Sequence, residues 1–109
     1  MNVSSVAGIG GEGSSIAYAA SKGALNTMTR SLARVLGPDI RVNAVCPGPI
    51  DTRWLRAVMS EEQLAARTAN YPLRRPAYPE DIADTIYYLA AGTTLTTGQC
   101  LVVDGGRTM

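Results

Sequence analysis

Tyr18 and Lys22 are four residues apart, so that on a helix their side chains would share one face. Lys22 is the only lysine of the chain and arginine supplies every other basic side chain, which indicates chemistry particular to a compact ammonium group. A cation beside a phenol favours the phenolate, so this pair could act as an acid or base. Ser5 precedes Tyr18 by thirteen residues and could hold a substrate oxygen in the same cleft.

The Tyr-x-x-x-Lys spacing alone would more often mark two surface residues on a helix. Three neighbouring features favour the chemical interpretation: the serine, an alanine-rich helix and a later Pro-Gly loop. Ser5 is expected at the end of a strand, where side chains reach the cleft of an α/β protein.

The first half of the chain predicts a strand, a long helix and a second strand. Residues 2–5 are typical of the tail of a strand, because Val3 is followed by a glycine-rich stretch. Residues 16–36 show the three-and-four apolar spacing of a helix, which Gly37 and Pro38 end. Residues 41–46 form the next strand, closed by Pro47-Gly48-Pro49.

The second half predicts two helices and a last strand. Ser60 and Gln63 have the spacing of a capping box for a helix over about 61–70. Pro79 to Asp81 suit the first turn of a helix that ends at Gly92. Residues 99–103 form an apolar run typical of a strand buried on both faces. This alternation predicts an α/β fold with parallel strands joined by crossovers.

The amino-acid composition excludes several classes of partner and of catalytic site. The net charge is +1 and the arginines are scattered, so neither nucleic acid nor a membrane is expected as a partner. The chain has no histidine, which excludes a Ser-His-Asp triad and the common histidine-based zinc sites, and no metal is expected. Cys46 and Cys100 lie in strand-like runs, which indicates free, buried thiols and a cytoplasmic location.

Several motifs together resemble the short-chain dehydrogenase/reductase family over essentially the whole chain. Residues 2–5 with Tyr18-Ala19-Ala20-Ser21-Lys22 resemble its active-site stretch, and residues 41–48 resemble the following strand and cofactor loop. Residues 76–83, 97–99 and 103–106 resemble its C-terminal segment. The resemblance implies the C-terminal part of a doubly wound Rossmann-type parallel sheet, with about three strands, a long active-site helix and small lid helices, in a single domain over 1–109.

The resemblance implies hydride transfer between NAD or NADP and a small-molecule alcohol or carbonyl substrate. Tyr18 would be the acid and base, Ser5 would hold the substrate oxygen, and Lys22 would bind the nicotinamide ribose and favour ionisation of the phenol. The loop bordering the nicotinamide would comprise four residues: Pro47, Gly48, Ile50 and Thr52.

Residues 54–71 would form the substrate lid, in which Trp54 and Met59 suggest an apolar lining for the substrate. Ordinary helix packing is an equally good interpretation of these side chains. The sequence as a whole also resembles oxoacyl-thioester reductases and related alcohol dehydrogenases. The family resemblance implies a homodimer or homotetramer.

Residues 8–13 satisfy G-x-G-x-x-G, the turn that binds dinucleotides. That motif requires a full strand before it and an acid near the end of the next strand, whereas the next strand here ends in Cys46-Pro47. We therefore expect a flexible loop between Ser5 and Tyr18, with a genuine dinucleotide turn as the weaker alternative.

The family's own glycine-rich turn has no counterpart among these residues, and neither does the asparagine of its catalytic tetrad. We expect the chain to be a fragment of a longer oxidoreductase that alone binds cofactor poorly and is inactive. The alternative is a shortened, non-catalytic product that only associates with full-length subunits.

Overall fold

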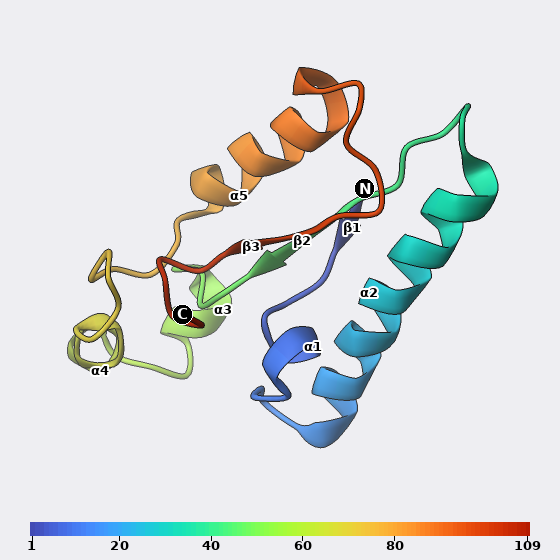
Figure 1. Cartoon of the computed structure of the whole chain (residues 1–109). Helices are drawn as coiled ribbons and strands as arrows, with labels where there is room; N and C mark the ends of the chain where they lie inside the picture. The colour runs from blue at the N-terminus through green and yellow to red at the C-terminus, as the bar shows by residue number, and fades with distance from the viewer.

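The computed structural model describes residues 1–109, and a three-stranded parallel sheet lies at its centre (Figure 1). The strands β1 (Asn2–Val3), β2 (Ala44–Pro47) and β3 (Cys100–Val103) follow the order β1-β2-β3. Asn2 pairs with Ala44, and Ala44 pairs in turn with Cys100. The expected α/β fold is confirmed, although β2 begins at Ala44 rather than at Arg41.

Helices cover both faces of the sheet. The helix α2 (Ile16–Leu36) lies on one face and α5 (Pro79–Tyr87) on the other (Figure 1). Successive residues of β2 contact the helices on opposite faces of the sheet. Val45 packs with Ile82 in the core beneath α5. The Cys46 thiol lies 3.5 Å from the Asn26 side-chain oxygen on α2. This two-sided cover is the doubly wound arrangement that the sequence predicts.

The helix α2 has the predicted bounds but not the predicted apolar face. Its buried residues are Asn26, Thr29 and Ala33, while Met28 and Val35 are exposed. Polar groups join the helix to the sheet, since the Asn2 amide donates to the Thr29 hydroxyl at 2.9 Å. Small and polar side chains allow a close approach of backbones, so they form the contact, while Leu25 and Leu32 are half-buried beside it.

The strand β3 corrects a second expectation. Leu101 and Val102 are 41% and 36% exposed, whereas the apolar run predicted burial on both faces. The strand is an edge of the sheet, with β2 as its only neighbour, and the helices do not cover it fully. Of the two free thiols, Cys46 is buried and Cys100 half-buried. Burial, reinforced by Cys100, raises the pKa of the Cys46 thiol.

The glycine-rich stretch is not wholly a loop. Ala7–Gly10 forms a short helix, α1, and the Ser5 hydroxyl accepts a hydrogen bond from the Ala7 amide at 3.1 Å. A Cβ on Gly8 would lie 2.5 Å from the Lys22 carbonyl carbon and 2.7 Å from the Gly23 amide nitrogen. The close packing of α1 on α2 therefore explains why residue 8 is a glycine. A role in binding a dinucleotide phosphate is not needed to explain it.

Two short helices, α3 (Arg53–Arg56) and α4 (Glu61–Thr68), fill the segment between β2 and α5. The capping box is confirmed: the Ser60 hydroxyl accepts from the Gln63 amide at 3.2 Å, and the Gln63 side chain accepts from the Ser60 amide at 2.8 Å. The helix ends at Thr68, slightly before the expected residue 70.

The helix α5 starts at Pro79 as predicted and continues as a π-helical turn, η1 (Tyr88–Gly92). Arg41 satisfies carbonyls that this turn leaves free, donating to Leu89 and Ala90 at 2.7 Å each. The end of the helix is thereby tied to the entry of β2.

Asp81 joins the start of α5 to the preceding loop. Its carboxylate forms a bidentate pair with Arg75, at 2.7 and 3.0 Å, and accepts from the Tyr78 amide at 2.7 Å. The hydrogen bonds from the Arg75 guanidinium lower the Asp81 pKa most, and the one from the Tyr78 amide adds to the effect, so that the pKa falls from its ordinary value of 3.8 to about 2.

This ion pair predicts a difference between the chain and its Asp81→Asn variant on acidification. Because the folded pKa lies below the unfolded one, the stabilisation is complete above pH 3.8 and is lost as pH falls through about 2. We expect the parent to be the more stable protein at pH 5 and the difference to be much smaller at pH 2, measured by urea unfolding at each pH. An equal difference at both pH values would contradict this linkage.

No helix of this structure combines the length and apolar character that crossing a membrane would require. The structure also gathers no group of three or more Cys, Asp or Glu side chains that could hold a metal ion.

Candidate active site

A cleft of about 660 Å³ opens at the carboxyl ends of the three strands. In open α/β sheets this edge is where ligands bind. Ser5 follows β1, Gly48 follows β2 and Arg107 follows β3, and all three line the cleft. Its volume is within the range of about 300–1,000 Å³ that is usual for small-molecule sites.

Ser5 and Tyr18 both line this cleft although they come from different elements. The Ser15 hydroxyl caps α2 by accepting from the Tyr18 amide at 3.1 Å, which places Tyr18 in the first turn. Ser5 is held by α1, since its carbonyl accepts from the Gly8 amide at 3.0 Å. The two hydroxyl groups that the sequence singled out thus reach one cavity.

Lys22 lies next to Tyr18 and is not part of the cleft lining. Its ammonium nitrogen is 5.7 Å from the centroid of the Tyr18 ring and donates to the Val3 carbonyl at 2.9 Å. The Ser4 hydroxyl also donates to the Lys22 carbonyl at 3.1 Å. The end of β1 therefore fixes both the lysine and the turn of α2 that carries it.

The Pro-Gly loop forms another wall of the cleft. Gly48, Ile50 and Thr52 line it, whereas Pro47 ends β2 and does not. A Cβ on Gly48 would lie 2.8 Å from the Asp104 Cβ, so a glycine is needed where the loop passes the end of β3. The Thr52 hydroxyl caps α3 by accepting from the Leu55 amide at 3.3 Å and retains its own proton to donate.

The segment expected to form the lid contributes an apolar wall. Trp54, Leu55, Val58 and Met59 all line the cleft, and Trp54 is 71% exposed. The two predicted substrate residues, Trp54 and Met59, thus line the same cavity as the catalytic candidates.

Three charged residues of the cleft were missed by the sequence analysis: Glu12, Arg67 and Arg107. Arg107 pairs with Glu12 at 3.0 Å, across almost the entire length of the chain. No local pattern connects these positions, because each lies beyond or at the end of a different element. Only the fold brings them together.

The residues present fit the nicotinamide end of a dinucleotide. The loop at Gly48 to Thr52 offers backbone groups and a hydroxyl, Tyr18 faces the same cavity, and Lys22 stands next to Tyr18. A three-stranded parallel sheet with helices on both faces and a cleft at its carboxyl edge defines the class of Rossmann-type α/β proteins.

Comparison with known proteins specifies the family within this class. Residues 1–108 match the model of the Enoyl-(Acyl carrier protein) reductase family. The chain is 42% identical over 109 residues to the short-chain dehydrogenase/reductase homolog YusR of Bacillus subtilis, of which it covers 82%. The chain belongs to the short-chain dehydrogenase/reductase family.

Other relatives are longer. A 3alpha-hydroxysteroid dehydrogenase of Mediterraneibacter gnavus is 45% identical over 107 residues. The match includes 96% of this chain but only 42% of the length of that relative. The structure of a 4-hydroxyisoleucine dehydrogenase mutant with NADH and succinate matches with a TM-score of 0.87 at 33% identity, covering 98% of this chain and 45% of that one. The matched part is the C-terminal portion of the family's Rossmann fold.

Proposed function

We propose that this chain supplies the catalytic part of an NAD(P)-dependent oxidoreductase that transfers a hydride between nicotinamide and an alcohol or carbonyl substrate. The observation that carries the proposal is the single cleft that Ser5, Tyr18 and the Gly48 to Thr52 loop share at the carboxyl edge of the sheet. The related 4-hydroxyisoleucine dehydrogenase was solved with NADH, which supports a nicotinamide cofactor.

Tyr18 is proposed to protonate the substrate oxygen during reduction and to deprotonate the hydroxyl during oxidation. Ser5 donates a hydrogen bond to the same oxygen and so holds it beside the phenol. Lys22, whose ammonium nitrogen is 5.7 Å from the centroid of the Tyr18 ring, is proposed to hold a positive charge beside the phenol during the proton transfer. Its contact with the Val3 carbonyl keeps the ammonium group in that place.

The nicotinamide, when bound, supplies or accepts the hydride. Lys22 is proposed to bind its ribose, and the backbone at Ile50 with the Thr52 hydroxyl to meet its carboxamide or phosphate. Trp54 and Met59 exclude water from the reacting carbon by providing an apolar wall.

A chimera tests the proposal. We would join residues 1–109 to the upstream part of 4-hydroxyisoleucine dehydrogenase, whose structure gives the matching junction. We expect the chimera to bind NADH, measured by nicotinamide fluorescence, and to reduce carbonyl compounds of a small panel, measured by loss of NADH absorbance. The isolated chain is expected to bind NADH weakly and to show no turnover. A folded chimera that binds NADH without reducing any compound would argue against the proposal.

A shortened subunit that assembles with longer relatives is a second candidate. The half-exposed Leu101 and Val102 on the edge strand β3 favour it, because parallel sheets are normally covered on both faces. Such a subunit would elute with a full-length relative in size-exclusion chromatography of the mixed proteins. If the two proteins elute separately and the chimera turns over substrate, the assembly role is excluded and the catalytic function is supported by itself.

A further inference from the structure

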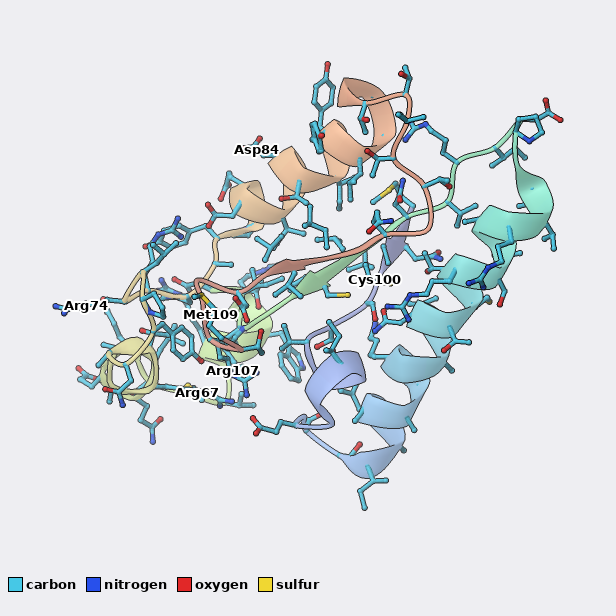
Figure 2. All side chains as sticks on the ribbon, in the orientation of Figure 1. Arg67, Arg74, Asp84, Cys100, Arg107 and Met109 are labelled. Carbon is cyan, nitrogen blue, oxygen red and sulfur yellow. The ribbon has the colours of Figure 1, made fainter.

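We propose that the substrate of this cleft carries an oxyanion group, such as a carboxylate, which Arg67 and Arg107 bind. This inference rests on the proposed function, since it names the class of substrate for the same site. Figure 2 labels Arg67, from α4, and Arg107, from the segment after β3, in the part of the view between α4 and α1. Both side chains line the cleft that also contains Ser5 and Tyr18.

The cleft has an excess of positive charge. Its charged lining residues are two guanidiniums and one carboxylate, that of Glu12. The Arg67 side chain, in the last turn of α4, forms no ion pair or hydrogen bond within the protein.

Arg107 is partly preorganised for an anion. Its side chain is 17% exposed and is held by one contact to Glu12, whose side chain is 81% exposed. Because the Glu12 carboxylate is open to solvent, a ligand carboxylate can replace it or share the guanidinium with it. The remaining donors of Arg107 have no partner in the protein, and a planar guanidinium binds an oxyanion through two of them.

The position of the arginines favours the substrate over the cofactor as the source of the anion. Arg67 follows the apolar wall of Trp54, Val58 and Met59 along the chain. The nicotinamide is proposed to lie against Gly48 to Thr52. A substrate with its reacting carbon at Tyr18 would extend over the apolar wall and place its charged end at the arginines.

Binding of two probes to the isolated chain tests the inference: 5-oxohexanoate and its neutral amide, 5-oxohexanamide, which differ in charge and hardly in shape. Calorimetry measures affinity, and Trp54, as the only tryptophan, reports on the cleft by fluorescence. We expect the acid to bind at least about tenfold more tightly than the amide, because hydrogen bonds to charged groups are the stronger ones. Higher ionic strength should reduce this preference.

Arg67→Gln and Arg107→Gln should each weaken binding of the acid by about tenfold and leave binding of the amide unchanged. Arg30→Gln is the matched control, since Arg30 is also an exposed helical arginine without an ion pair and lies outside the cleft. Thermal melting of each variant establishes that it is folded. Equal affinity for the two probes, or loss of acid binding in Arg30→Gln as well, would overturn the inference and leave hydride transfer in the chimera intact.

Two further outcomes have defined meanings. If ADP-ribose binds the chain and loses affinity in Arg67→Gln, the arginines hold cofactor phosphates and the substrate assignment is wrong. If calorimetry detects binding of neither probe, the cleft does not take small carbonyl compounds in this chain, which contradicts the inference. Turnover in the chimera then decides separately whether the proposed function survives.

Discussion

Tyr18→Phe is expected to lower the turnover of the chimera by about 10²–10⁴-fold, the usual contribution of a positioned acid or base. The change removes the proton that the substrate oxygen needs and keeps the ring beside Lys22. Binding of NADH should persist, because Lys22 and the Gly48 to Thr52 loop remain in place. Stopped-flow reduction with saturating NADH measures the chemical step, and fluorescence titration measures the cofactor.

Tyr87→Phe provides the control for the loss of a phenol. Tyr87 is exposed on α5 and lies outside the cleft, so its variant should retain the turnover of the parent. Residual turnover of Tyr18→Phe above a tenth of the parent value would remove Tyr18 from the proposed role. The cleft would then need another group to move the proton, and Glu12 is the one carboxyl group in its lining.

Gly8→Ala is expected to destabilise the chain by about 1–3 kcal/mol, the range for a methyl group forced into a well-packed contact. The new Cβ would meet the backbone of Lys22 and Gly23 at 2.5 to 2.7 Å, and backbone cannot rotate away as a side chain can. The helix α1 must therefore move off α2. Urea unfolding followed by circular dichroism measures the change.

Gly23→Ala is the matched control, because the two glycines face each other across the same contact. A Cβ on Gly23 would meet only the Gly8 carbonyl oxygen at an ordinary 3.5 Å. Alanine is favoured over glycine inside a helix by up to about 1 kcal/mol, so this variant should be as stable as the parent or more stable. Equal destabilisation by both changes would contradict the close packing of α1 on α2.

The Gly8 contact also affects the candidate site. Ser5 is joined to α1 by its carbonyl, through the Gly8 amide, and by its hydroxyl, through the Ala7 amide. Displacement of α1 would carry Ser5 away from Tyr18. In the chimera, Gly8→Ala should therefore reduce turnover at temperatures where the variant remains folded, whereas Gly23→Ala should not.

The amino-acid sequence by itself predicts those features that local signals encode. The bounds of α2, the capping box at Ser60 and the Pro79 start of α5 depend on residues within one or two helical turns of each other, and all three are found. The parallel sheet follows from the alternation of elements. The spacing of Tyr18 and Lys22 likewise places the two side chains near each other.

The tertiary structure decided what depends on contacts between distant segments. It turned Asn26 and Thr29 toward the sheet in place of the apolar side chains, and it made α1 from residues that resemble a phosphate loop. It also brought Arg67 and Arg107 into the cleft of Ser5 and Tyr18. Local periodicity carries no information on which face of a helix meets a partner closely, or on which loops converge at one edge of a sheet, because both depend on how the complete chain packs.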